Sequence, residues 1–432
     1  MKRGLGIGVL VLLAVGMVYG LIVIRREASY WQFVERGDEA LARDDSYAAI
    51  EALSVAILLK PGSMVAYLKR GEAYRRRNEF DAALRDLRQA ADLDPLATHP
   101  RELLGDVQYA RATAHAQSAP GLFLRAAERY REYVQLDDRS ARGHYKLGLA
   151  SYRAGQLQVA VAALREAIRL DAKFAEAHYT LGVCLRASGS RDAALASLEK
   201  AVKLSPALLG AREELADFYA ELGRYNAGLP HLEALVALQP DAARARALGL
   251  GYARAGHLDR AVGQLSHAVE RYPDDAATYV AVGRVWLERA ARGGGRVELS
   301  KALQALQGSV NSDSNSEALT LLGRALAMSG DLGRAEQVLE QAAARFPVDP
   351  DAFRVLADVA ERRGRASVSQ RALLDYGALV RSESLSAPLL ARIAEAYMAK
   401  GDMQAARAAV AHALEKEPGN SLALDLKSRL HE

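Results

Sequence analysis

Very little in this sequence would support chemistry. Cys184 is the single cysteine of the 432-residue chain, so neither an intramolecular disulfide nor a cysteine-based metal cluster can form. The nine histidines show no His-Glu-x-x-His spacing, and the sequence contains no Gly-x-x-x-x-Gly-Lys phosphate loop and no Gly-x-Ser-x-Gly elbow. We therefore expect a non-enzymatic protein that needs no metal or cofactor, with Cys184 as a buried, inert thiol.

Aromatic residues are also scarce, at 6% of the chain, and the net charge is only +4. Acidic residues are interspersed among the basic ones, which argues against a nucleic-acid-binding surface. Alanine, leucine and arginine dominate instead, a composition typical of helices. A single compact core stops growing near ~250–300 residues. The length of the chain therefore favours an all-α fold that grows by adding repeats.

The longest uncharged run extends from Gly4 to Ile24, with basic residues on both sides. A helix of this length can cross a hydrocarbon core of ~30 Å. A cleaved signal peptide has a shorter apolar stretch and an Ala-x-Ala-like cleavage site, and neither is present. No cysteine follows the run, which excludes a lipoprotein. We therefore predict an uncleaved transmembrane helix within an anchor segment, residues 1–29.

The charges around this run leave its orientation open, because lysine and arginine are similarly frequent on both sides. The short basic start resembles a signal anchor, which would place the rest of the chain outside the cytoplasm. The arginine- and alanine-rich composition suggests a bacterial inner membrane. We predict repeats on the extracytoplasmic (periplasmic) side, with a cytoplasmic location as the alternative.

From residue 30 onward the chain repeats every 34 residues. Gly37, Gly71 and Gly105 keep this spacing, and so do Leu53 and Leu87. A period of 34 is typical of stacked helix–turn–helix units. The pattern resembles the tetratricopeptide repeat, with small residues at positions 8 and 20, a large apolar residue at 24 and proline at 32. This resemblance implies a right-handed superhelical solenoid of about eleven units. They start at Tyr30, Met64, Thr98, Ala141, Ala175, Leu209, Ala242, Ala276, Ser316, Pro350 and Ala387.

Position 8 is glycine or alanine in every unit, and position 20 is alanine, glycine or serine. A glycine inside a helix costs ~1 kcal/mol relative to alanine, so these glycines need a packing reason. We expect the two helices of a unit to cross too closely for a larger side chain. The apolar residue at position 24 would fill this seam. Glycines that predict left-handed caps end the first helix in seven units: Gly155, Gly189, Gly223, Gly256, Gly330, Gly364 and Gly401.

The repeats are predicted to fill residues 30–418, followed by a capping helix over 419–432. Extra residues near 112–123 and 290–300 interrupt the third and eighth units. They are interpreted as joints, as partner contacts, or as tolerated loop growth.

The first helix of each unit lines the concave groove in this family, so the resemblance implies protein or peptide partners there. Tyrosine and arginine, the types enriched at interface hot spots, gather at groove positions. The predicted binding residues are Arg142, Tyr145, Tyr152, Arg153, Tyr179, Arg186 and Arg246. The alternative is that the tyrosines pack between units and the arginines are solvated.

Two other features have a structural and a functional interpretation. His144 and His178 share position 4, a packing position, and we expect them to be structural. The basic run 75–77 is interpreted either as a contact with anionic lipid or as a solvated loop end.

The resemblance implies a non-enzymatic scaffold for protein–protein interactions at a membrane, in bacterial envelope, secretion or polysaccharide-export assembly. The alternative is a cytoplasm-facing adaptor that regulates an enzyme or protease. Anchored proteins of lipopolysaccharide control are similar in outline, but they carry a rubredoxin-like metal module that this chain lacks. No nucleic-acid partner is expected, and a homo-oligomer is left open.

Overall fold

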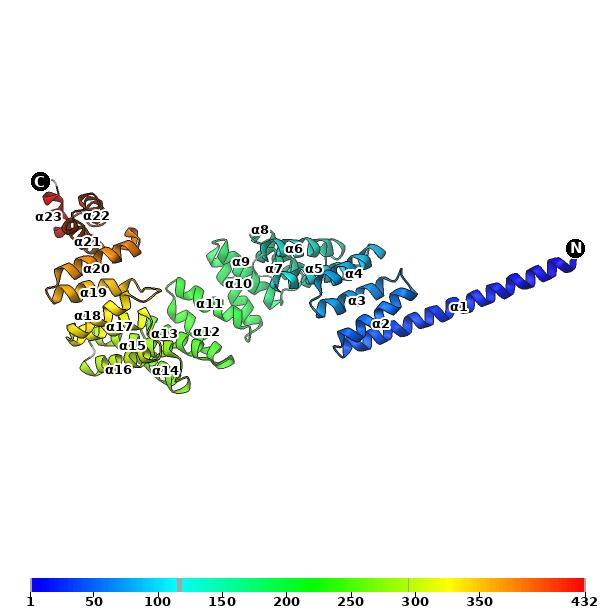
Figure 1. Cartoon of the computed structure of the whole chain (residues 1–432), viewed down its shortest axis with the longest axis horizontal. Coiled ribbons are helices and arrows are strands. Elements are labelled where there is room, and N and C mark those ends of the chain that lie inside the picture. The colour runs from blue at the N-terminus through cyan, green and yellow to red at the C-terminus, as the bar shows by residue number, and fades with distance from the viewer. Residues whose placement is uncertain (1, 115–118, 294, 431–432) are drawn as a thin grey trace. The chain divides into compact units, whose positions relative to one another are not determined.

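The computed structural model describes residues 2–114, 119–293 and 295–430, with the backbone alone for residues 2–11, 119, 311 and 312. The described residues form 23 α-helices and a short 3-10 helix (Ser382–Ser384), and no strand occurs among them. The chain divides into two compact units, Met1–Leu215 and Ala216–Glu432. Figure 1 labels their helices. The prediction of an all-α solenoid is confirmed.

The helices of the first unit are α1 (Lys2–Ala42), α2 (Ser46–Leu59), α3 (Met64–Arg76), α4 (Phe80–Leu93), α5 (Thr98–Ala114), α6 (Ala119–Leu136), α7 (Ala141–Arg153), α8 (Leu157–Leu170), α9 (Ala175–Ala187) and α10 (Arg191–Leu204). Helix α11 (Leu209–Glu221) crosses the boundary. The second unit continues with α12 (Tyr225–Leu238), α13 (Ala242–Arg254), α14 (Leu258–Arg271), α15 (Ala276–Ala291), α16 (Arg296–Ser312), α17 (Ser316–Ser329), α18 (Leu332–Ala343), α19 (Asp351–Arg362), α20 (Ala366–Leu379), α21 (Ala387–Lys400), α22 (Met403–Lys416) and α23 (Ser421–Arg429).

The predicted repeat starts agree closely with the helices. After the first repeat, each predicted start is the first residue of a helix, except that α19 begins at Asp351, one residue after Pro350. The first repeat differs, because its predicted start lies inside the unbroken helix α1. The division into anchor, solenoid and cap stays a prediction.

The seam between the two helices of a repeat has the predicted small residue at position 8. A Cβ atom on Gly182 would lie 2.6 Å from Cγ of Leu198, and one on Gly71 would lie 2.7 Å from Cγ of Leu87. Both leucines are fully buried. The small residue is therefore required because the side chain at position 24 occupies the space where its Cβ would be.

The predicted left-handed caps are also present. All seven cap glycines have φ between 68° and 90°. At the same position of the first two repeats stand Asp44 (φ 59°) and Asn78 (φ 60°), which the sequence analysis missed. Aspartate and asparagine are the side chains that tolerate this backbone region best.

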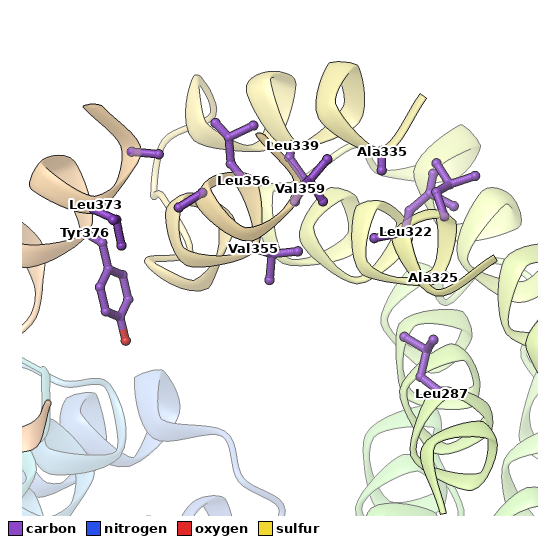
Figure 2. Close-up of a cluster of buried hydrophobic side chains, with 14 of the residues drawn as sticks. Leu287, Leu322, Ala325, Ala335, Leu339, Val355, Leu356, Val359, Leu373 and Tyr376 are labelled. Atoms are coloured by element: carbon purple, nitrogen blue, oxygen red, sulfur yellow. The ribbon is translucent and has the colours of Figure 1, made fainter. Parts of the chain in front are cut away.

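The core of the second unit is an apolar cluster that continues from repeat to repeat (Figure 2). Leu322 of α17, Leu339 of α18, Leu356 of α19 and Leu373 of α20 follow one another in it. No repeat encloses its own core, so each buries its apolar faces against its neighbours.

The extra residues of the third and eighth repeats lengthen helices. Helices α5 and α6 have 17 and 18 residues, and α15 and α16 have 16 and 17, whereas α7 and α8 have 13 and 14. Residues 115–118 and 294 lie outside the described residues. Among the interpretations given above, simple loop growth is therefore wrong for most of the added residues.

Helix α1 is much longer than its partner α2, with 41 residues against 14. At ~1.5 Å per residue, its N-terminal part must extend beyond the first repeat (Figure 1). Among the residues whose side chains the structure describes, no helix is both long and apolar enough to cross a membrane. The predicted span, residues 4–24, lies partly outside them, because only the backbone is described as far as residue 11.

Candidate protein-binding surface

Six of the seven predicted binding residues lie on α7 and α9 of the first unit. We call Arg142, Tyr145, Tyr152, Arg153, Tyr179 and Arg186 the α7–α9 surface. Tyr145 and Tyr152 are seven residues apart, which places them on one face of α7, two turns from each other. The seventh, Arg246, belongs to the second unit, where it forms an ion pair with Asp275.

The tyrosines of this surface are half-buried, and burial raises the pKa of each. The Tyr145 ring packs on Phe174, with 4.8 Å between ring centroids, and the Tyr179 hydroxyl oxygen lies 3.1 Å from where a Cβ on Gly210 would be. Tyr179 therefore packs against the next repeat, as the alternative interpretation proposed, and Tyr145 packs on the residue that directly precedes α9.

Two of the three tyrosine hydroxyl groups nevertheless lack a hydrogen-bond partner among the described residues. Within the described part of the chain, neither Tyr152 nor Tyr179 forms a side-chain hydrogen bond. The Glu214 carboxylate also contributes to the raised pKa of both tyrosines, after burial. Glu214 was missed by the sequence analysis, because it occupies a position of α11 that is not expected to face the groove.

The arginines of the surface fall into two groups. Arg186 Nη1 donates to Glu214 Oε2 at 2.5 Å, so its charge is compensated. Arg142 and Arg153 are exposed and form no ion pair with any residue that the structure describes. The Arg153 guanidinium lies 5.5 Å from the centroid of the Phe123 ring, which holds its stem against the protein. The surface thus carries two arginines without an ion-pair partner and two tyrosine hydroxyls without a side-chain hydrogen bond among the described residues.

The two position-4 histidines are structural, as predicted. His144 Nε2 lies 3.1 Å from the carbonyl oxygen of Asp138, and His178 Nε2 lies 3.2 Å from that of Ala172. Each ring closes the turn that precedes its own helix.

Cys184 is fully buried, and this burial raises the pKa of its thiol to about 12. The predicted burial is confirmed. The raised pKa agrees with an inert thiol, since the thiolate is the reactive form. The described residues contain no group of three or more side chains arranged to bind a metal ion.

The basic run 75–77 is compensated within the protein. Arg75 donates to Glu72, Arg76 donates to Glu72 and Asp44, and Arg77 donates to Glu79. The Arg77 guanidinium also lies 3.3 Å from the centroid of the Tyr47 ring. The hypothesis of a lipid contact at this run loses its basis, because its charges already have partners.

A cavity of about 780 Å³ in the second unit was not predicted. It lies between the first turns of α17 and the turn after α18, and Phe346, Asp349 and Arg324 are among its lining residues. Phe346 is 97% exposed, and burial raises the pKa of Asp349.

Comparison with known proteins agrees with this architecture. Family models described as tetratricopeptide repeat match residues 65–95, 109–173, 145–208, 316–359 and 387–420. The chain contains tetratricopeptide repeats. It is 32% identical over 106 residues to the small glutamine-rich tetratricopeptide repeat-containing protein 2 of Mycosarcoma maydis. That match covers 24% of this chain and only 28% of the relative.

Solved structures with similar folds include yeast Tom70, at 12% identity, with 94% of this chain and 99% of that chain covered and a TM-score of 0.41. PilF of Pseudomonas aeruginosa is 21% identical, over 49% of this chain and 92% of that chain, with a TM-score of 0.39. YrrB, described as a protein of this repeat type with an unusual peptide-binding site, is 22% identical, over 45% and 95%, with a TM-score of 0.37. These similarities concern the repeat fold alone.

Proposed function

We propose that this tetratricopeptide repeat protein is a non-enzymatic scaffold that binds a segment of a protein partner on the α7–α9 surface. The observation that carries this proposal is that one surface holds tyrosine hydroxyls without a side-chain hydrogen bond and arginines without an ion pair among the described residues. Arginine and tyrosine are enriched at interface hot spots, and tyrosine supplies a large contact area at low cost in conformational entropy. Arg142 and Arg153 would bind carboxylates of the partner, and Tyr152 and Tyr179 would donate to its backbone carbonyls.

Charge reversal on this surface tests the proposal. A photocrosslinking amino acid at Tyr152 would identify the partner, and Arg142→Glu with Arg153→Glu should then reduce its capture at least about tenfold, as expected for a pair of hot-spot residues. The matched control is Arg88→Glu with Arg165→Glu, because these arginines are also exposed and form no ion pair in the described structure. Equal capture by both double variants would disprove the site.

We also propose that α1 anchors the scaffold in a membrane. The side chains of residues 12–19 and 21–24 are exposed along α1, and all of these residues are uncharged. Apolar side chains around a whole helix are unfavourable in water and favourable in lipid. The uncharged run continues through residues 4–11 in the sequence, which supports a span of sufficient length.

The proposed location is a bacterial inner membrane with the repeats outside the cytoplasm, in an envelope, secretion or polysaccharide-export assembly. Protease treatment of spheroplasts that carry a C-terminally tagged chain tests it. Loss of the tag, with a cytoplasmic control protein intact, is the expected result. A tag that is protected until lysis would place the repeats in the cytoplasm and favour an adaptor for an enzyme or protease.

A further inference from the structure

Exposed apolar side chains gather where α1 leaves the first repeat. Trp31 of α1 is 53% exposed, and Leu58 in the last turn of α2 is 76% exposed. Arg25, Arg26 and Lys60 are exposed cations at the same end of the repeat. We call these five residues the α1–α2 rim.

Side-chain contacts define where this rim lies along the axis of α1. Arg26 Nε donates to the carbonyl oxygen of Leu59 at 2.5 Å, and Lys60 Nζ donates to Glu27 at 2.7 Å. The end of α2 is therefore level with residues 26 and 27. Ile24, the last residue of the apolar run, lies only ~3 Å further along the axis, at ~1.5 Å per residue.

Trp31 belongs to the same group through Tyr30. The two rings meet edge to face with centroids 5.0 Å apart, and the Lys60 ammonium lies 4.9 Å from the Tyr30 centroid. Trp31 follows Ile24 by seven residues, which corresponds to ~10 Å along a helix. An indole at this distance from the apolar run is close to the layer that tryptophan prefers at a membrane.

We propose that the α1–α2 rim rests on the anionic headgroup layer of the membrane, so that the first repeat lies against the lipid surface. This inference rests on the anchoring by α1 proposed above. Leu58 would enter the interfacial layer, which spans ~5–7 Å on each side of the hydrocarbon core. The backbone of Trp31 lies beyond this layer, but its indole would reach back into it, because side chains on a helix point toward the helix N-terminus. Three cations against the single Glu27 carboxylate leave the rim positive, and this charge complements anionic lipid. The rim is thus continuous with the apolar run and matches the surface in charge.

Tryptophan fluorescence tests the rim, because Trp31 and Trp286 are the two tryptophans of the chain. The full-length Trp286→Phe variant would be reconstituted in phosphatidylcholine–phosphatidylglycerol vesicles that contain lipid brominated near the headgroup end of its acyl chains. We expect emission from Trp31 to fall about twofold relative to vesicles without bromine, as for an interfacial indole.

The matched control moves the tryptophan to the other end of α2. Tyr47 is 72% exposed and lies ~16 Å from Leu58 along the helix. The triple variant Trp31→Phe, Trp286→Phe, Tyr47→Trp should keep its emission. As a second probe, Leu58→Trp with both natural tryptophans replaced by phenylalanine should be quenched like Trp31.

Flotation of the same vesicles separates the two proposals. If the chain floats with the vesicles and neither Trp31 nor Leu58→Trp is quenched, the rim proposal is overturned and the anchor stands. If the chain does not float, the anchor fails and the rim fails with it. Quenching that is equal at Tyr47→Trp would also overturn the rim, since the contact would not be confined to one end.

Discussion

The third and fifth repeats of the first unit fill the same seam with different side chains. In the fifth repeat, Leu198 occupies the space beside Gly182. In the third, the ring of Tyr130 occupies the corresponding space beside Gly105. Both side chains are buried. The close helix crossing therefore demands a glycine opposite a large side chain, but it does not demand that the large side chain be aliphatic.

The tyrosine adds a polar link that leucine cannot make. Its hydroxyl donates to Asp106 Oδ1 at 2.7 Å, and Lys146 Nζ donates to both Asp106 and Glu102 at 2.7 Å. Lys146 lies on α7, so the network joins the third repeat to the fourth. Desolvation raises the pKa of Tyr130 far above its usual value, which keeps this hydroxyl a donor. The difference teaches that an apolar seam stabilises one repeat, whereas the tyrosine seam also couples neighbours.

The largest effect is expected from emptying the leucine seam. Leu198→Ala should lower the free energy of unfolding by about 2–5 kcal/mol, because it removes a fully buried side chain and leaves a cavity. Urea unfolding would measure this loss, and faster thiol labelling of Cys184 on the adjoining α9 would locate it. Leu198→Met is the control, with an expected loss under about 1.5 kcal/mol. Equal losses for both variants would contradict the packing explanation.

Overfilling the seam should have the next largest effect. Gly182→Ala places a Cβ 2.6 Å from Leu198 Cγ and should cost about 1–3 kcal/mol despite the better helix propensity of alanine. Gly263→Ala in α14 is the matched control, because no atom lies within 4 Å of its added Cβ. That variant should instead stabilise by about 0.5–1 kcal/mol. The same sign for both substitutions would refute the argument.

A pH dependence should distinguish the two seams. His99, and then Lys146, holds the pKa of Glu102 at about 2, against 4.5 ordinarily. Ionised Glu102 therefore stabilises the fold above about pH 4.5, and this contribution is lost as the pH falls towards 2. With solvent screening we expect about 1–2 kcal/mol. The stability difference between wild type and Glu102→Gln should shrink over this range, whereas that for Leu198→Ala should stay constant.

His99 acts with the opposite sign. Its pKa is raised, first by the neighbouring Glu102 carboxylate at 3.6 Å, so its contribution is present below about pH 6.5 and disappears as the pH rises through the folded value. The midpoint of urea unfolding, measured between pH 2 and 8, would show both losses of stability: that of Glu102 at low pH and that of His99 at higher pH. A Glu102→Gln variant with an unchanged loss of stability at low pH would contradict the assignment.

The smallest effect is expected from removing only the tyrosine hydroxyl. Tyr130→Phe keeps the ring beside Gly105 and should cost about 0.5–1.5 kcal/mol, as for one hydrogen bond. Hydrogen exchange should show weaker protection at the junction of α6 and α7 and unchanged protection in α9 and α10. Protection lost equally in both places would show that the polar link does not couple the third and fourth repeats.

Much of the fold could be predicted because its rules are local. The seam joins residues 16 apart, such as Gly182 and Leu198, and the cap glycines end helices through their own φ angle. The α7–α9 surface was predicted as a set of positions on two helices. The sequence did not predict which of its charges are compensated, because the partner of Arg186 is Glu214, which lies in the next repeat.

The sequence by itself determined the helical repeat, the seam and the caps, since each depends on short-range spacing within a repeat. Only the tertiary structure decided which charges remain uncompensated. The arginines 75–77 found carboxylate partners, whereas Arg142 and Arg153 have none among the described residues. The physical reason is that an exposed side chain can reach several neighbours of similar energy. Which one it pairs with depends on how adjacent helices are placed, and no spacing rule contains that information.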